Sequence, residues 1–223
     1  MKQIKLLFLL ASASVTGAFA QSNGLTDMSQ SRYAKMANTG IDAVHWTNGF
    51  WGERFNVFSG TSLQSMWNTW NTPEVSHGFR NFEIAAGVCK GEHWGPPFHD
   101  GDMYKWMEGV ASVYAVNKDP ELDKLMDNFI ACVVKAQRAD GYIHTPVVIE
   151  ELNKGIDSHA LGDQHKQTVI GTKVGDENEK GAFANRLNFE TYNLGHLMMA
   201  GIVHRRATGK TTLFDAAVKA TDF

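Results

Sequence analysis

The chain has 223 residues, 43% of them hydrophobic, and its 21 basic and 24 acidic residues leave a net charge of −3. This acidic balance argues against nucleic acid as a partner. No apolar run after residue 20 reaches the roughly 18 residues that a membrane-spanning helix needs, so we expect no membrane span.

Residues 1–20 have the pattern of a signal peptide. Two lysines precede a short apolar core, and Ala18 and Ala20 fit the small-residue rule for cleavage after residue 20. We therefore expect an exported protein, periplasmic or extracellular in a bacterium. Residues 21–43 would then be a lead-in to a folded domain at residues 44–223. The aromatic residues near the start of this domain, including Trp46 and Trp51, are expected to pack in its core.

The first segment that resembles a site lies at the start of a helix predicted over residues 102–116. An acid at a helix start can cap unpaired N–H groups, so one acid here has a purely structural interpretation. A cluster of polar and aromatic side chains at such a point is also typical of a carbohydrate cleft, where rings stack on sugars and polar groups bind hydroxyls. The candidate residues are Asp100, Asp102, Tyr104, Lys105 and Trp106.

A second helix is predicted from residue 120 to about residue 134, because apolar residues recur there at helical spacing. Asp119 can cap this helix, and Pro120 suits its first turn. Only two residues separate it from the preceding helix. The two helices should therefore form an antiparallel hairpin.

Residues 139–187 show little helical periodicity and are rich in Gly, Asp, Lys and Gln. Loops of this length are usually functional or disordered. We expect residues 140–145 to form an ordered turn that leads into a site and includes His144. Residues 157–180 are expected to form a mobile excursion.

A second hairpin repeats the plan, with helices at 188–207 and 212–223 and with Gly209 suited to the end of the first helix. Repeated hairpins with apolar faces on both helices predict an all-α fold, a stacked or toroidal array in which one hairpin cannot bury its faces alone. Four apolar residues of the last helix should need partners from further helices: Leu213, Phe214, Ala217 and Val218.

Two polar residues of the helix at 188–207 are further site candidates. Glu190 lies at the helix start, where interaction with the helix dipole and hydrogen bonding to a sugar hydroxyl are equal alternatives. His196 shares a face with apolar residues, which favours a buried, hydrogen-bonded histidine over one that lines a cleft. Glu108, on the earlier helix, is interpreted as a solvated acid.

The residues of this chain predict no metal or cofactor site. The loop histidines His99 and His159 lack metal-ligand spacing, and there is neither a nucleophile elbow nor a glycine-rich phosphate loop. Cys132 lies on a periodic apolar helix, which favours a small buried thiol. A disulfide with Cys89 is the alternative in an exported protein.

Four motifs in collinear order resemble the bacterial β-L-arabinofuranosidase family, glycoside hydrolase family 127 and its close relatives. The motifs are Phe98–Glu108, Ala136–Ile143, Tyr192–Leu197 and Ala207–Lys210, and the resemblance extends over about residues 44–223. It implies an (α/α)6 barrel followed by β-sandwich domains, with this chain holding the first part of the barrel.

The same resemblance implies a cysteine nucleophile on a zinc ion and a glutamate acid/base, both from segments well after the helix at 188–207. Neither Cys89 nor Cys132 matches that motif, so the catalytic residues and the zinc site are expected beyond Phe223. Where many family members have His-Glu-Leu-Tyr, this chain has an apolar ring at Phe189. This departure leaves the exact glycoside open.

We therefore predict the amino-terminal portion of an exported retaining glycoside hydrolase that acts on β-L-arabinofuranosides or related glycosides and is inactive without its catalytic segment. Its partner is a glycan substrate, and homo-oligomers are left open. The alternatives are a non-catalytic carbohydrate-binding protein, or a lyase or epimerase on a helical toroid. The expected cleft-wall residues are Asp100, Asp102, Tyr104, Lys105, Trp106, His144, Glu190 and His196.

Overall fold

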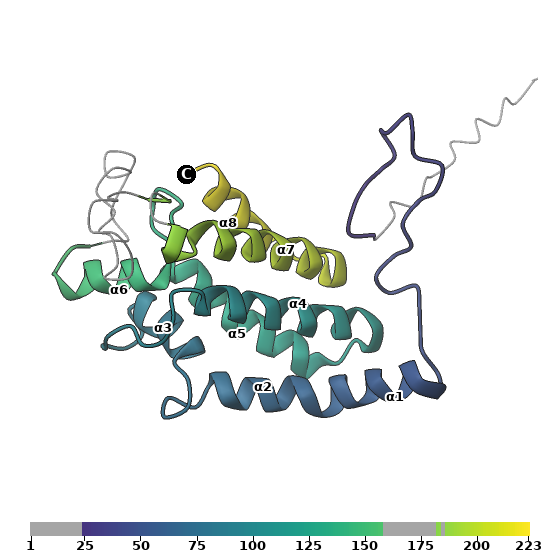
Figure 1. The fold of residues 1–223 in the computed structure, drawn as a ribbon, viewed down its shortest axis with the longest axis horizontal. Coiled ribbons are helices and arrows are strands. Elements are labelled where there is room, and N and C mark those ends of the chain that lie inside the picture. Colours follow the sequence, from purple (N-terminus) through teal and green to yellow (C-terminus); the bar gives the residue numbers. More distant parts are fainter. Residues whose placement is uncertain (1–23, 158–181, 184–185) are drawn as a thin grey trace, which may run out of the picture.

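The structure is a computed structural model that describes residues 24–157, 182–183 and 186–223. The expected signal peptide, His159 and nearly all of the expected excursion at 157–180 lie outside these residues. Every regular element within the described ranges is helical, which confirms the predicted all-α class (Figure 1). Among the same residues, no helix is both long and apolar enough to cross a membrane.

The helices follow one another with short connections except before α4 and α7. In chain order they are α1 Gly49–Val57, α2 Leu63–Trp70, α3 Gly78–Ala85, α4 His99–Asn117, α5 Pro120–Ala136, α6 Thr145–Asn153, α7 Glu190–Thr208 and α8 Thr212–Thr221. A π-helical turn at Phe58–Ser62 joins α1 to α2, and a 3-10 turn at Arg186–Asn188 precedes α7.

The first predicted hairpin is formed by α4 and α5. Lys118 ends α4 in the left-handed region, with φ of 54°, and so reverses the chain direction. The Asp119 side chain then accepts a hydrogen bond of 2.9 Å from the Glu121 backbone N–H, and Pro120 occupies the first helical position. Both predicted start signals of α5 are therefore confirmed. They could be predicted from the sequence because they act within four residues of one another.

The second predicted hairpin is formed by α7 and α8, joined through Gly209 with φ of 79°. Gly201 allows the two helices to approach closely, because a Cβ there would lie 3.1 Å from the Phe214 Cα. The expectation of unpartnered apolar residues on the last helix is wrong for Leu213 and Ala217, which are buried because α8 packs against α5 as well as α7. Val218, named in the same expectation, is 42% exposed.

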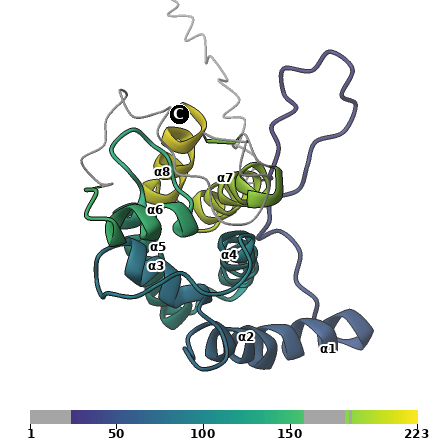
Figure 2. The same ribbon diagram turned by 60° about the vertical axis from the view of Figure 1, so that its left-hand side comes forward.

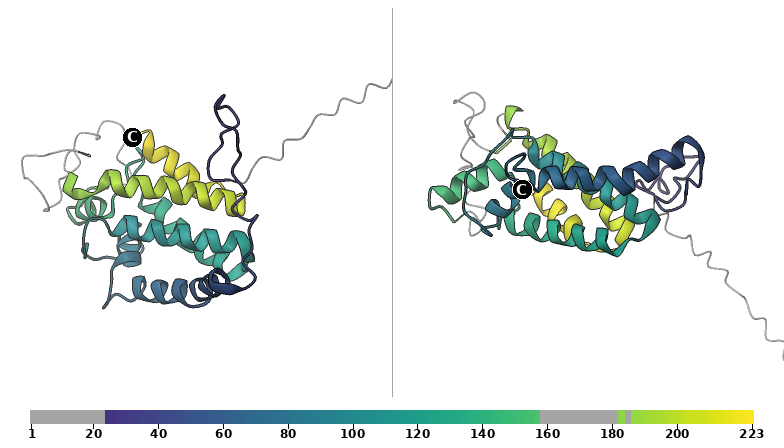
Figure 3. Two further views of the ribbon diagram at one scale, coloured as in Figure 1. Left: turned by 45° about the vertical axis from the view of Figure 1, so that its right-hand side comes forward. Right: turned by 90° about the horizontal axis from the view of Figure 1, so that it is seen from below.

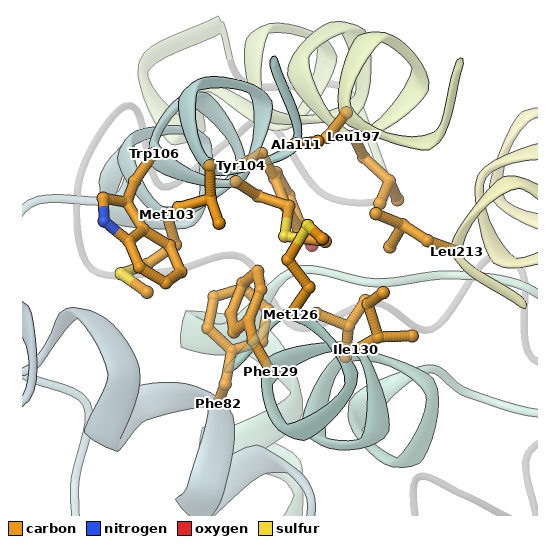
Figure 4. Close-up of a cluster of buried hydrophobic side chains, with 14 of the residues drawn as sticks. Phe82, Met103, Tyr104, Trp106, Ala111, Met126, Phe129, Ile130, Leu197 and Leu213 are labelled. Carbon is orange, nitrogen blue, oxygen red and sulfur yellow. The ribbon is translucent and has the colours of Figure 1, made fainter. Parts of the chain in front are cut away.

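The hairpins stack into two layers of helices. Contacts run from α2 to α4 to α7 in one layer and from α3 to α5 to α8 in the other. Figure 2 shows α4 and α7 on one side and α3, α5, α6 and α8 on the other, and Figure 3 shows the α1–α2 segment along one edge of the array. The hydrophobic core lies between the layers (Figure 4).

The helix α6 was not predicted. It begins with Thr145 and Pro146, and its residues Val147, Val148 and Ile149 are all buried. A helix that is buried on most of its sides has no polar face, so the 3.6-residue periodicity that indicates a surface helix is missing from its sequence.

The aromatic residues at the start of the domain lie at the surface in this structure. Trp51 and Phe50 on α1 are 65% and 59% exposed, and Trp46 is 46% exposed. The expectation that Trp46 and Trp51 belong to the core is therefore wrong for the described residues. Among these residues α1 contacts chiefly the π-helical turn that follows it, so little of the array covers its apolar side chains.

Candidate functional site

Two of the predicted cleft residues, Tyr104 and Trp106, lie in the hydrophobic core. Each is 1% exposed, and both point between the layers (Figure 4). Trp106 stacks on Trp67 with ring centroids 4.9 Å apart and donates a hydrogen bond of 3.3 Å to the Leu63 carbonyl. Their placement differs from the expectation because α2, α5 and α7 all pack against α4 and leave little of its surface free.

Asp100 is also buried, at the start of α6 rather than in a cleft. Its carboxylate accepts hydrogen bonds of 2.7 Å from the Thr145 backbone N–H and 2.6 Å from the Thr145 hydroxyl, and it lies 3.5 Å from Nδ1 of His144. Asp100 therefore caps α6, a helix 45 residues away, and neither it nor Asp102 caps α4 through its side chain.

Asn193, which the sequence analysis did not single out, completes this cluster. Its Oδ1 accepts a hydrogen bond of 2.9 Å from the Gly101 backbone N–H, and its Nδ2 donates one of 2.9 Å to the Pro97 carbonyl. Nδ2 also lies 3.4 Å from Nδ1 of His144. Its place one turn after Glu190, on the same helix face, is a signal that could have found it.

We call Asp100, His144, Thr145 and Asn193 the junction, because they join the starts of α4, α6 and α7. Burial opposes ionisation of Asp100, but hydrogen bonds from His144 and Thr145 outweigh it and lower the pKa of the carboxyl. Gly101 makes the junction sterically feasible, because a Cβ there would lie 2.7 Å from Oδ1 of Asn193. The junction therefore holds a buried carboxylate that fixes three helix ends.

Three further candidates on α4 and α7, Asp102, Lys105 and His196, belong to a partly exposed row. Nζ of Lys105 lies 2.8 Å from Oδ1 of Asp102 and donates a hydrogen bond of 2.8 Å to the Tyr192 hydroxyl. The Tyr192 ring packs edge-on against His196 at 4.7 Å, and Nδ1 of His196 lies 3.3 Å from Oε1 of Glu108. We call these five residues the polar strip.

The polar strip carries both signs of charge. Burial alone would lower the pKa of Lys105, but hydrogen bonds to Asp102 and Tyr192 outweigh it and raise that pKa, so the ammonium stays charged at neutral pH. Burial raises the pKa of Glu108, while His196 and Lys105 oppose the shift. The strip thus presents charged donors and acceptors on one face of two adjacent helices.

Glu190 lies apart from the strip and is 5% exposed. Its carboxylate accepts hydrogen bonds from the Tyr142 hydroxyl and from the Phe183 backbone N–H, the latter at 2.8 Å. Tyr142 belongs to the predicted turn, which is ordered: Asp140 accepts a hydrogen bond of 3.1 Å from the Tyr142 N–H. Burial, followed by the Glu190 charge, raises the pKa of Tyr142 well above its usual range.

The structure thus separates the eight candidates into four groups. Asp102, Lys105 and His196 share the polar strip, Asp100 and His144 share the junction, Glu190 anchors the turn, and Tyr104 and Trp106 belong to the core. Glu108 was expected in solvent, yet its side chain is only 24% exposed because α7 packs beside it. Of the eight candidates, the partly exposed ones all belong to the strip.

The described residues do not fit the zinc centre that the resemblance implies. Among them there is no group of three or more His, Cys, Asp or Glu side chains that could hold a metal ion. Cys89 and Cys132 are free, partly buried thiols, which rejects the disulfide alternative. Burial raises the pKa of both, so neither is activated as a thiolate.

Comparison with known proteins shows which family the chain resembles. The model of the β-L-arabinofuranosidase GH127 catalytic domain matches residues 43–223. The non-reducing end β-L-arabinofuranosidase of Bifidobacterium longum subsp. longum is 30% identical over 147 residues, which cover 66% of this chain and 19% of that protein.

Solved structures agree with this match. A glycoside hydrolase is 66% identical with a TM-score of 0.56, covering 91% of this chain and 22% of the other. A GH127 β-L-arabinofuranosidase from Geobacillus stearothermophilus T6 is 31% identical with a TM-score of 0.62, covering 80% and 25%. A GH127 β-arabinofuranosidase is 26% identical with a TM-score of 0.61, covering 82% and 26%.

The stacked hairpins therefore correspond to part of the (α/α) barrel of these enzymes. The chain spans about a fifth to a quarter of the length of the relatives that it matches. Because the family model covers most of the chain, the chain belongs to the GH127 β-L-arabinofuranosidase family.

Proposed function

We propose that the protein carrying this chain releases terminal β-L-arabinofuranose from the non-reducing end of a glycan, and that the polar strip forms part of its sugar-binding wall. The proposal is supported by the family membership and by the name of the Bifidobacterium relative. The observation that carries the site is the strip itself, where Lys105 and His196 stand partly exposed on adjacent helices of the same layer.

The chemistry of the strip suits a sugar with several hydroxyl groups. The Lys105 ammonium has three donors, two of which are engaged by Asp102 and Tyr192, so one remains for a sugar oxygen. His196 is held through Nδ1, so Nε2 is the ring nitrogen that can contact a hydroxyl. The strip would bind and orient the furanose ring.

The described residues are not assigned the bond-breaking step. A glycosidase needs two suitably placed groups across the glycosidic bond, and the described cysteines and acids do not form such a centre with a metal. We propose that the catalytic segment is supplied by sequence that follows residue 223. Reading the coding DNA past the Phe223 codon tests this part directly. A downstream glutamate and clustered cysteines would support it, and a stop codon there would contradict it.

The first prediction concerns Lys105. Replacing it with alanine should lower kcat/KM for a p-nitrophenyl β-L-arabinofuranoside roughly ten- to 150-fold, because a hydrogen bond to a charged group contributes about 1.5–3 kcal/mol. Lys124, exposed on α5 in the other layer, provides the matched Lys→Ala control and should leave kcat/KM unchanged.

The assay should compare the β-L-arabinofuranoside with the α-linked anomer and with a β-galactoside. Hydrolysis of the first alone supports the proposed specificity. Sugar binding without hydrolysis, in the protein at its natural length, would instead favour a carbohydrate-binding protein. An equal loss of activity in the Lys105 and Lys124 variants would show that the polar strip does not bind the substrate.

A further inference from the structure

The contact between Glu108 and His196 joins the two central helices on their partly exposed face. Oε1 of Glu108 lies 3.3 Å from Nδ1 of His196, although the two residues are 88 positions apart in the chain. Their side chains are 24% and 28% exposed. Protein thus covers most of each side chain, in contrast to a fully solvated surface pair.

This contact restricts the imidazole in a defined way. A carboxylate accepts a hydrogen bond, so the proton of the neutral ring is held on Nδ1 and the lone pair is left on Nε2. The Tyr192 ring packs edge-on against the imidazole at 4.7 Å and limits its rotation from a second side. Neighbours on two sides therefore constrain the orientation of His196, and the carboxylate favours the Nδ1–H tautomer.

Further neighbours hold the two restraints in place. The Tyr192 hydroxyl accepts a hydrogen bond of 2.8 Å from Lys105, whose ammonium also pairs with Asp102. The charged groups that act on Glu108 are His196 and Lys105, on α7 and α4. The strip is thus one connected network, and Glu108 is its link to the Nδ1 side of the imidazole.

We propose that Glu108 is a positioning residue for substrate binding: it holds His196 as the Nδ1–H tautomer so that Nε2 can accept a hydrogen bond from a furanoside hydroxyl. The inference rests on the proposed function, because it needs a hydroxylated substrate against the strip. Glu108 itself contacts only the imidazole in this role, so its effect on the substrate passes through His196.

A double-mutant cycle tests this route. We expect Glu108→Ala to lower kcat/KM about tenfold, mainly through KM, in the range expected for loss of one charge-assisted hydrogen bond. If Glu108 acts only through His196, the double variant Glu108→Ala/His196→Ala should be no less active than His196→Ala alone. Glu108→Gln keeps an acceptor oxygen for Nδ1–H and should recover most of the loss.

The control is Glu53→Ala, which removes an exposed glutamate on α1 and should leave kcat/KM unchanged. Thermal unfolding should shift by no more than about 2 °C for Glu108→Ala, because partly exposed ion pairs contribute little stability. Losses that multiply in the double variant, or an unaltered kcat/KM in Glu108→Ala, would overturn the proposal.

The tautomer of His196 can be measured by NMR, independently of an activity assay. In ¹⁵N-histidine-labelled protein, the His196 signals, assigned by their absence in His196→Ala, should show protonated Nδ1 and unprotonated Nε2 at neutral pH. Glu108→Ala should shift them toward the Nε2–H form. A His196 already in the Nε2–H form with Glu108 present overturns the inference. The predicted tautomer in a protein that hydrolyses no arabinofuranoside overturns the proposed function instead.

Discussion

At the scale of single residues, position along a helix does not reveal which side chains face a ligand. Lys105 and Trp106 are neighbours in the sequence, yet the Lys105 side chain is 42% exposed and Trp106 is 1% exposed. The reason is that successive residues of a helix point about 100° apart. The polar–aromatic motif therefore divides between the strip and the core.

The burial of Trp106 leads to a prediction about stability. Trp106→Ala should lower the free energy of unfolding by about 3–5 kcal/mol, because it removes a large ring from a close-packed core and leaves a cavity. Trp51→Ala, at a residue 65% exposed, is the matched control and should change it by less than about 1 kcal/mol. Urea unfolding measures both. If the Trp106→Ala variant had normal stability but a raised KM, Trp106 would contact the substrate in the cleft and the core assignment would be wrong.

At the scale of elements, the first turn of α4 stabilises a different helix. Asp100 and Asp102 both lie in that turn and both interact with its dipole. Asp100 also accepts two hydrogen bonds at the start of α6, whereas Asp102 pairs with Lys105 at the surface. Asp100 thus links α4 to α6, whereas Asp102 forms an ion pair within α4.

This difference predicts that the Asp100→Ala and Asp102→Ala variants are impaired in different ways. Asp100→Ala should cost about 2–4 kcal/mol and speed amide hydrogen exchange in α6, because buried donors of Thr145 lose their acceptor. Asp102→Ala should cost less than about 1 kcal/mol and act on substrate binding. Exchange in α6 that is equally slow in both variants would argue against the cap.

At the scale of the whole molecule, a partly buried histidine, His93, makes the stability of the fold depend on pH. Burial is the largest cause that lowers the pKa of His93 to about 4, and the nearby His144, His99 and His77 lower it further, while Asp100 opposes them. The unfolded histidine, with an ordinary pKa of 6.5, binds a proton at a higher pH than the folded one. This contribution to stability is therefore present above pH 6.5 and is lost as the pH falls toward 4.

The expected size is about 1–2 kcal/mol between pH 7 and pH 5, measured by urea unfolding at the two values. His93→Gln should remove most of this difference, because the amide does not titrate. His45→Gln, at an exposed histidine, should keep it. Asp100, whose pKa is lowered from 3.8, adds acid sensitivity only below that pH. If the free energy of unfolding of the His93→Gln variant still changed equally between pH 7 and pH 5, another group would be responsible.

The sequence by itself determined the hairpins and their caps. The interaction of Asp119 with Glu121 and the left-handed Gly209 each involve a few consecutive residues, so local chemistry is sufficient to predict them. The four collinear motifs likewise pointed to the family that the comparisons confirm. The short helix α6 escaped prediction because its buried residues carry no amphipathic period.

Only the tertiary structure decided which polar residues act together. Asp100 reaches Thr145 across 45 positions, and Glu108 reaches His196 across 88. Such pairs form only when α4 packs against α6 and α7, and no periodicity within one helix encodes that contact. Burial was decided in the same way: Trp106 became a core residue and Glu108 a partner of His196 because neighbouring helices cover particular faces of α4.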